Sequence, residues 1–501
     1  MLINASRSRD ILECIASLSS DEVATPPAVA NQVLDLLPVE VWSDKDLKWL
    51  DPACKTGVFL REAARRLMEG LKDSIPDETE RRMHIFTKML HGYALTELTA
   101  QMSRRSLYYN KDASNKKLSV VPFKREEGNI QFSGQDHPYN TYGKCSICGA
   151  GREVFGVPGN RERHAYDFIH SEEGDMKFDV VVGNPPYQLE SGGFAAQATP
   201  IYNKFVEQAF KLQPRYIAMI IPSRWFTGGL GLDSFRARML ASEQFRELVD
   251  YTDPGELFPG VEIKGGVCYF LWDRDYVGPA TVTTIQEGRR SPSSERYLGQ
   301  FGDVFVRFNE ALPVLEKLRK ANTSAMDSMV SATNPFGIAT NFKNYVEDPK
   351  DGYIRLATGD GIKWVSPREI KSNNQLVPLH KVLISKAYGA GDGYPHQIIG
   401  RPVYLPPNSA STMTYLVAGI FNTRAEADSF ISYLNTRLVR FLVALRKPTQ
   451  HVIGKSFSFV PVQSWDRAWD DETLYKKYNI SEAEISFIES IVRPMPHGVD
   501  E

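Results

Sequence analysis

The stretch that most constrains this chain is FDVVVGNPPY at residues 178–187. Its three consecutive β-branched valines indicate a short strand that is buried on both faces. Regular pairing must stop at the glycine and the two prolines, because a proline nitrogen carries no hydrogen for a sheet. We therefore expect polar and aromatic groups at the carboxyl end of a buried strand, where open α/β sheets bind their ligands.

The residues that follow this strand suit the recognition of a planar amine. The side-chain oxygen of Asn184 and the carbonyl of Pro185 can together accept both hydrogens of an exocyclic amine. The ring of Tyr187 can stack on a planar base. The alternative is a proline-rich turn that only ends the strand, and the asparagine and tyrosine around the prolines favour the chemical interpretation.

The sequence Asn184-Pro185-Pro186-Tyr187 resembles the catalytic motif of amino-methyltransferases that use S-adenosylmethionine, above all the DNA adenine-N6 methyltransferases. The resemblance implies an α/β fold with a Rossmann-like S-adenosylmethionine-dependent methyltransferase core, and it makes all four residues candidates for the catalytic site. It also implies that Tyr187 and a second aromatic ring stack on the target base. Phe258 matches the position of that second ring.

A second element of the same family lies nearer the N-terminus. Residues 47–60 predict an apolar strand, a turn of small residues and a helix, and such a turn lets backbone N–H groups approach a ligand. The segment resembles the family's cofactor loop, with Asp51, Ala53 and Gly57 at matching positions. Lys55 stands where the family has glycine. Either this larger residue hinders the approach of the backbone to the methionine carboxylate, or its charge attracts that carboxylate.

Two more cofactor contacts are implied by the resemblance. Thr25 and Pro26 match the family's first cofactor-binding element, although a threonine before prolines is also typical of a plain helix N-cap. Glu97 is the acid nearest the position of the family's ribose-binding acid, where this chain has Ala94. A first-turn acid favoured by the helix dipole is the alternative for Glu97.

The run at residues 164–169, directly before the catalytic stretch, predicts another strand. Asp167 and Phe168 at its end match the family element that contacts the adenine of the cofactor. The resemblance gives Asp167 the exocyclic amine and Phe168 the packing against the ring. A surface acid before a loop is the alternative.

Residues 110–160 form a polar, glycine-rich insertion in the core. Cys145 and Cys148 lie there in a Cys-x-x-Cys-Gly sequence, which can present two thiolates to one metal ion. The chain has five cysteines but no second such pair, so a structural zinc site would need histidines at non-standard spacing. The candidates are His137, His164 and His170. A metal-free turn with reduced thiols is the alternative.

The cofactor motifs stop near residue 275, and we predict two domains. A methyltransferase domain over 1–280 precedes a mixed α+β target-recognition domain over 281–501, with a linker or exposed hairpin at 287–296. Near residue 440, basic side chains surround a helix with an apolar face and could meet DNA phosphates, unless they are simply solvated. They are Arg437, Arg440, Arg446 and Lys447.

Composition sets outer limits on function. The 501 residues are too many for one core, and the net charge of −2 means that DNA contact must come from local basic patches. No apolar run approaches the roughly 18 residues of a membrane span, and the start of the chain lacks the order of a signal peptide. An odd number of cysteines gives no disulfide framework. We expect a cytoplasmic protein with no membrane partner.

The order of the elements resembles the gamma class of adenine-N6 methyltransferases in restriction-modification systems. It implies site-specific methylation of N6 of adenine in double-stranded DNA after base flipping, in a restriction-modification or related defence system. A separately encoded restriction endonuclease is a potential partner, because no endonuclease domain is expected before the cofactor elements. Two alternatives stay open: an RNA-base or protein-glutamine methyltransferase, and a non-catalytic DNA-binding subunit with a decayed cofactor loop.

Overall fold

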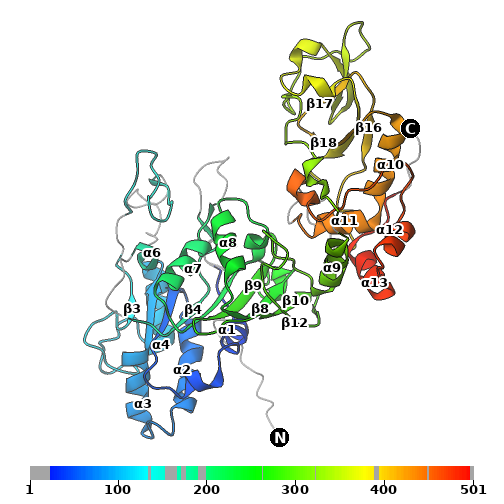
Figure 1. The fold of residues 1–501 in the computed structure, drawn as a ribbon. Coiled ribbons are helices and arrows are strands. Elements are labelled where there is room, and N and C mark those ends of the chain that lie inside the picture. The colour runs from blue at the N-terminus through cyan, green and yellow to red at the C-terminus, as the bar shows by residue number, and fades with distance from the viewer. Residues whose placement is uncertain are drawn as a thin grey trace, which may run out of the picture. The chain divides into compact units, whose positions relative to one another are not determined.

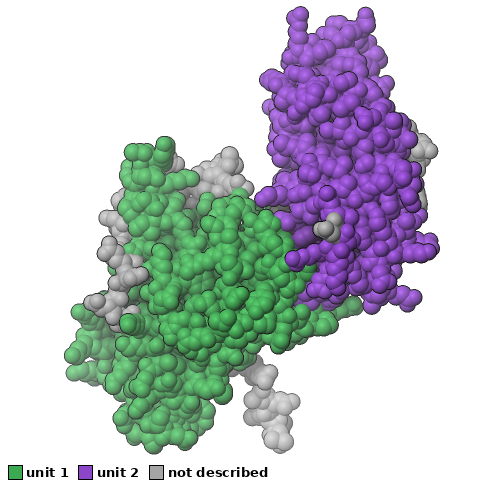
Figure 2. All heavy atoms as spheres, viewed as in Figure 1, with its two compact units in different colours: residues 1–305 green, residues 306–501 purple. Residues whose placement is uncertain are grey.

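The structure is a computed structural model of the 501-residue chain. It describes residues 23–133, 137–152, 166–170, 177–189, 199–261, 263–321, 323–388, 394–447 and 451–496. The chain divides into two compact units, Met1–Phe305 and Val306–Glu501 (Figure 1 and Figure 2). Each unit is described separately below.

The first unit is built on a ten-stranded sheet with the order β11-β10-β8-β9-β7-β4-β1-β2-β3, in which β12 also pairs with β10. The strands from β7 to β3 run parallel to one another, and β9 is inserted antiparallel between β7 and β8. This topology confirms the predicted Rossmann-like core. The strands are β1 (Trp49–Cys54), β2 (Leu90–Ala94), β3 (Ile130–Gln131), β4 (Val180–Gly183), β7 (Tyr216–Pro222), β8 (Phe245–Tyr251), β9 (Val267–Asp273), β10 (Ala280–Gln286), β11 (Arg289–Arg290) and β12 (Ser294–Arg296).

Helices cover both faces of this sheet (Figure 1). In β4, Val180 and Val182 belong to the apolar cluster with α1 and α2, whereas Val181 belongs to the cluster with α7 and α8. The run of valines is therefore buried on both faces, as predicted. The helices are α1 (Pro27–Leu34), α2 (Val58–Gly70), α3 (Glu78–His84), α4 (Glu97–Tyr108), α6 (Asp167–His170), α7 (Tyr202–Lys211) and α8 (Asp233–Ala241), and the short strands β5 (Gln188–Leu189) and β6 (Thr199–Pro200) pair apart from the sheet.

Two segments of the first unit differ from the sequence prediction. Residues 167–170 form the helical turn α6 and not the end of a strand, and Phe168 of this turn stacks on Phe205 of α7. Residues 164 and 165 lie outside the described part of the chain. Strand β10 pairs in parallel with β8, and β12 returns along β10. The sheet therefore continues past the predicted boundary at residue 280, and the division between the units falls after Phe305.

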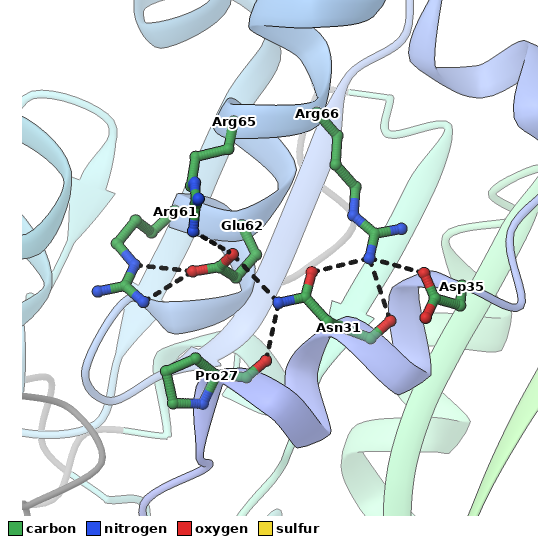
Figure 3. A network of polar contacts seen from close by, with 7 residues as sticks. All are labelled: Pro27, Asn31, Asp35, Arg61, Glu62, Arg65 and Arg66. Carbon is green, nitrogen blue, oxygen red and sulfur yellow. Dashed lines mark hydrogen bonds and ion pairs between the residues drawn. The ribbon is translucent and has the colours of Figure 1, made fainter. Parts of the chain in front are cut away.

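A polar network fastens α1 to α2 (Figure 3). Asn31 Nδ2 donates to Glu62 Oε2 at 3.1 Å, and Asn31 Oδ1 accepts from Arg66 Nη2 at 2.7 Å. The Glu62 side chain is only 3% exposed and forms ion pairs on its other side. Because α1 follows Thr25 and α2 follows the cofactor loop, the network holds these two predicted elements together. Its members are Pro27, Asn31, Asp35, Arg61, Glu62, Arg65 and Arg66.

The second unit contains two three-stranded sheets, β14-β13-β17 and β16-β15-β18. Leu356 of one sheet and Leu383 of the other belong to one apolar cluster, so the two sheets share a core. The mixed α+β architecture agrees with the predicted class. Its strands are β13 (Ile354–Thr358), β14 (Gly361–Val365), β15 (His380–Ser385), β16 (Val403–Leu405), β17 (Ser409–Ser411) and β18 (Tyr415–Phe421), and its helices are α9 (Leu312–Lys320), α10 (Arg424–Asn435), α11 (Arg437–Ala444), α12 (Asp471–Lys477) and α13 (Glu482–Ile491). Among the described helices of the whole chain, none is long and apolar enough to cross a membrane.

Candidate active site

The predicted catalytic motif and the predicted cofactor loop meet at the carboxyl ends of two neighbouring parallel strands, β4 and β1. Strand β4 ends at Gly183, directly before Asn184. A Cβ atom on Gly183 would lie 2.7 Å from Oδ1 of Asp51, which is closer than any real contact of this kind. The glycine therefore lets the carboxyl group of the cofactor loop lie against the end of the catalytic strand.

Asn184 is 2% exposed, and its carboxamide has a defined orientation. Its Nδ2 lies 2.9 Å from Thr25 Oγ1 and 3.4 Å from the carbonyl oxygen of Val23. A backbone carbonyl can only accept a hydrogen bond, so the amide nitrogen must be the atom that faces Val23. Its Oδ1 is buried and receives no hydrogen bond from the described residues. The amide oxygen is thus available to accept a hydrogen bond from a ligand.

Thr25 lies in this site in a way that the sequence did not reveal. The N-cap residue of α1 is Pro26, and no side chain caps the helix. The hydroxyl of Thr25 instead accepts the hydrogen bond from Asn184, a residue 159 positions later in the chain. The prediction of Thr25 as a plain helix N-cap is therefore wrong. Its role with Pro26 as a cofactor contact stays a prediction.

Lys55, the residue that departs from the family pattern, extends toward Val23 and Tyr187. Its side chain is buried, and Nζ donates to the carbonyl of Val23 at 3.1 Å. The same Nζ lies 6.0 Å from the centre of the Tyr187 ring. Lys55 therefore crosses from the cofactor loop to the catalytic motif. Lys55 is not among the predicted site residues, although its departure from the family pattern marks its position.

The cofactor loop combines a buried acid with a free helix start. Burial raises the pKa of Asp51 to about 7, although a hydrogen bond from Ala53 N (3.0 Å) and the charge of Lys55 both lower it. Gly57 has φ +75° and is the N-cap residue of α2, whose first turn receives no side-chain cap. A helix start of this kind, with unpaired backbone N–H groups, suits an anionic group such as a carboxylate.

The two aromatic rings predicted to hold the target base lie together. Tyr187 is 6% and Phe258 2% exposed, and their ring centres are 6.5 Å apart at an interplanar angle of 75°. Burial raises the pKa of Tyr187 well above its ordinary value, so its phenol is neutral at physiological pH. The rings touch edge to face in this arrangement. A base can lie between them only after they part.

Asp167 and Phe168 occupy the helical turn α6 in the interior. Asp167 is 7% exposed, so it is not the surface acid of the alternative prediction. Its Oδ2 accepts from Ser133 N at 2.8 Å, and its buried Oδ1 has no hydrogen-bond partner in the described chain. Phe168 stacks on Phe205 with 5.9 Å between ring centres. One carboxylate oxygen is therefore left to accept a hydrogen bond.

Glu97 is exposed in the first turn of α4, behind a capping box formed by Thr96 and Thr99. Its Oε1 accepts from Gln101 Nε2 at 3.3 Å. This is the environment of an ordinary first-turn acid. Its ribose-binding role stays a prediction that no contact among the described residues supports.

The two cysteines of the insertion meet two of the candidate histidines. The possible ligand atoms of His137, Cys145, Cys148 and His170 all lie within 4.8 Å of one another. Burial raises the pKa of Cys148 to about 12. Burial, together with His137, lowers the pKa of His170 to about 4. The third candidate, His164, lies outside the described residues.

The basic residues near α11 are engaged within the second unit. Arg440 is fully buried and donates to four backbone carbonyls, those of Asn435, Thr436, Gln397 and Arg493. The other three also make internal contacts: Arg437 with Glu489, Arg446 with the ring of Phe459, and Lys447 with the carbonyl of Tyr388. For Arg440 the prediction of a phosphate contact or a solvated position is wrong, because its donors are saturated by carbonyls.

Comparison with known proteins identifies the family. A model of the Eco57I restriction-modification methylase family matches residues 88–258, which include the catalytic motif and Phe258. An uncharacterized adenine-specific methylase of Mycoplasma pneumoniae (strain ATCC 29342 / M129) is 40% identical over 305 residues, covering 55% of this chain and 72% of the relative. This chain belongs to the adenine-specific methylases. The resemblance drawn from the motif is therefore confirmed at the level of the family.

Two solved restriction-modification enzymes are similar to this adenine-specific methylase at low identity. The type IIL enzyme MmeI in complex with DNA is 11% identical, with a TM-score of 0.47 over 86% of this chain and 64% of that chain. The type ISP enzyme LlaGI, a nuclease-deletion mutant with a DNA substrate mimic, is 11% identical, with a TM-score of 0.49 over 86% of this chain and 45% of that chain. The adenine-specific methylase thus spans less than two thirds of either enzyme.

Proposed function

We propose that this adenine-specific methylase transfers the methyl group of S-adenosylmethionine to N6 of adenine in double-stranded DNA. The observation that carries the proposal is the orientation of Asn184, whose Nδ2 is held by Thr25 while its buried Oδ1 has no hydrogen-bond partner in the described chain. A buried acceptor in this state costs free energy unless a ligand donates to it. The family supports adenine as the source of that donor.

The residues at the strand ends fit S-adenosylmethionine. The free Oδ1 of Asp167 can accept from the amine of its adenine, with Phe168 beside the ring. The start of α2 at Gly57 can receive its carboxylate, and Lys55 adds a positive charge nearby. When bound, the cofactor supplies an electrophilic methyl group on a sulfonium. The further proposed contacts are Thr25, Pro26, Asp51, Ala53 and Glu97.

The catalytic motif prepares the amine for attack. Asn184 Oδ1 and the carbonyl of Pro185 each accept one hydrogen, which favours a tetrahedral nitrogen with its lone pair directed outward. Pro186 continues the turn without adding a competing N–H donor. The new nitrogen–carbon bond forms in line as the carbon–sulfur bond breaks, the electron pair stays on sulfur, and one amine proton is released to solvent. Positioning supplies most of the acceleration, and no metal is required for the transfer.

The reacting nitrogen of a paired adenine lies inside the duplex, so the base must be flipped out. Tyr187 and Phe258 can then stack on its two faces, which requires that their edge-to-face contact opens. The base replaces that contact with two stacking contacts, so the closed pair need not remain a barrier once DNA is bound.

We assign reading of the DNA sequence to the second unit, Val306–Glu501. The strand ends of the first unit are occupied by the proposed cofactor and base sites, and base-edge readout needs other side chains in a groove. The family model supports a restriction-modification setting. A separately encoded endonuclease is the partner that we propose for that setting.

The experiment is methyl transfer by the full chain from labelled S-adenosylmethionine to unmethylated double-stranded DNA, with mass spectrometry of the released nucleosides. We expect N6-methyladenine with the wild type and none with Asn184→Ala. Asn184→Ala should still bind the cofactor, because Asn184 contacts Thr25 and the proposed amine. Calorimetric titration with S-adenosylmethionine checks this point.

Parallel reactions with RNA and with a glutamine-containing protein fraction decide between the alternatives. Label in either of these but not in DNA would overturn the proposed substrate. Cofactor binding without any transfer would favour the non-catalytic alternative. Loss of both binding and transfer in a folded Asn184→Ala would instead give that residue a structural role.

A further inference from the structure

We propose that His137, Cys145, Cys148 and His170 bind one zinc ion, and that this ion fastens the turn α6 to the insertion. The sequence offered the two cysteines and three candidate histidines, His137, His164 and His170, at spacings that did not select among them. The structure supplies two histidines from different segments, one before the cysteine pair and one at the end of α6. The set is therefore a complete Cys2His2 group.

The cysteine pair has the backbone of a metal-binding turn. Gly149 N donates to the carbonyl of Cys145 at 2.9 Å, and Ala150 N donates to Cys148 Sγ at 3.4 Å. Gly149 has φ +85°, a conformation that glycine adopts without strain. This turn directs both sulfur atoms to one side. A backbone N–H that points at a sulfur also stabilises the thiolate that a metal ion requires.

The separations between the side chains suit a single ion. Cys145 Sγ lies 3.7 Å from His170 Nε2, and Cys148 Sγ lies 3.2 Å from His137 Nδ1. Ligands at about 2.0–2.3 Å from zinc with tetrahedral angles are roughly 3.5 Å apart. Two thiolates and two neutral imidazoles also balance the charge of the ion, which a buried site needs. Four protein ligands leave no open position, so the ion is structural.

The site reaches the proposed cofactor pocket through α6. This single turn begins with Asp167 and Phe168 and ends with His170, so a bond from His170 to zinc fixes the whole turn. Cys145, Cys148 and Phe168 also belong to one apolar cluster. The effect on the cofactor rests on the proposed function of Asp167 and Phe168, whereas metal binding does not. Loss of zinc should therefore weaken S-adenosylmethionine binding without changing the catalytic motif.

The first test is the metal content of the full chain purified under reducing conditions. We expect about one zinc per chain, and replacement by Co2+ should give the absorption of a tetrahedral ion with thiolate-to-cobalt charge transfer. Cys148→Ser and His170→Gln should lose the metal. The matched controls Ser146→Ala, between the cysteines, and His84→Gln, outside the cluster, should keep it. Wild-type protein without stoichiometric zinc, or equal metal content in all variants, would overturn the site.

The second test compares S-adenosylmethionine binding by zinc-loaded and chelated wild-type protein, which avoids variants that fail to fold. If only about one metal-free chain in ten keeps the α6 turn, the apparent Kd for S-adenosylmethionine rises about tenfold. Added zinc should restore the original Kd. An unchanged Kd after complete removal of zinc would refute the fastening of α6. Zinc-loaded protein that binds cofactor but methylates nothing would count against the proposed function and leave the metal site standing.

Discussion

Two buried charged side chains, one in each unit, differ in how their hydrogen-bonding groups are used. In the first unit, Asp51 lies at the end of β1 and accepts a hydrogen bond from Ala53 N, and burial raises its pKa to about 7. In the second unit, Lys381 is fully buried and donates to three backbone carbonyls, at 2.6 to 3.1 Å. Burial lowers the pKa of Lys381 to about 8.

The difference lies in how fully the hydrogen-bonding groups are used. An ammonium group has three donors, and Lys381 places all three on protein carbonyls. Asn184 and Asp167 in the first unit each keep a buried oxygen without a hydrogen-bond partner in the described chain. A buried side chain whose hydrogen-bonding groups all have protein partners indicates a structural role. A buried side chain with an unused hydrogen-bonding group in a pocket indicates a ligand site. Four predictions test this distinction.

The largest effect is expected for Arg440→Met in the second unit. The change removes the side-chain donor of four carbonyls, of which those of Thr436 and Gln397 keep a backbone donor. The carbonyls of Asn435 and Arg493 lose their donor among the described residues, and orphaned groups cost about 1–3 kcal/mol each, so we expect a loss of at least about 2 kcal/mol. Urea unfolding measures it. Arg437→Met, which removes an ion pair with a partly exposed Glu489, should cost only about 0–1 kcal/mol. Similar losses in both variants would contradict a structural role specific to Arg440.

The next effect is the pH dependence that Asp51 imposes on stability. Its pKa is about 7 in the folded chain against an ordinary value of 3.8, so the folded state holds the proton more tightly. The free energy of unfolding should therefore fall as pH rises from 3.8 to about 7. Asp51→Asn should remove this slope. Urea midpoints of both proteins without cofactor, measured across that pH range, check this prediction. The same pH dependence in wild type and Asp51→Asn would show that ionisation of Asp51 does not destabilise the folded state.

A smaller pH dependence of stability, with the opposite sign, is expected from Lys381. Its pKa falls from 10.5 to about 8 on folding, so the unfolded chain alone keeps the proton between these values. Stability should therefore rise with pH over that window, and Lys381→Met should abolish the rise. Lys343→Met, an exposed position in the same unit, is the control. The same rise of stability with pH in wild type and Lys381→Met would contradict a pKa of Lys381 lowered by burial.

The smallest effect is expected for Thr25→Val. Valine keeps the shape but cannot accept the hydrogen bond from Asn184, so the carboxamide is held only by its longer hydrogen bond to the Val23 carbonyl. We expect kcat to fall about tenfold, or about 1.4 kcal/mol, with KM for S-adenosylmethionine nearly unchanged. Thr25→Ser should restore kcat. A rise in KM at constant kcat would instead support Thr25 as a direct cofactor contact.

Much of the first unit could be predicted because its strands are continuous apolar runs. The strand predicted within residues 47–60 forms as β1, and the valines of β4 are buried on both faces. Strand β10 was missed because its alternating threonines follow a turn and precede a charged segment typical of a linker. The strand predicted at 164–169 is not formed over residues 167–170, because Phe168 there stacks on Phe205 of α7 and not in the sheet.

Site residues could be predicted where they belong to a short sequence motif. They could not be predicted where folding brings together residues that are far apart in the sequence. Asn184 and Phe258 each belong to a short recognisable pattern. The pairing of Thr25 with Asn184 joins residues 159 positions apart, and no local pattern encodes it. The same holds for His137 and His170, whose spacing to the cysteines matches no standard ligand pattern. Arg440 shows the converse, because a cation on an amphipathic helix gives no sign of the carbonyls that surround it.

The carbonyl of Val23 accepts from both Asn184 and Lys55. A main-chain carbonyl is present whatever side chain stands at that position, so substitution of Val23 cannot delete this acceptor. A single substitution can remove the hydroxyl of Thr25. The carbonyl of Val23 is lost as an acceptor only if the backbone itself moves. Part of the support for the Asn184 carboxamide therefore does not depend on the identity of any side chain.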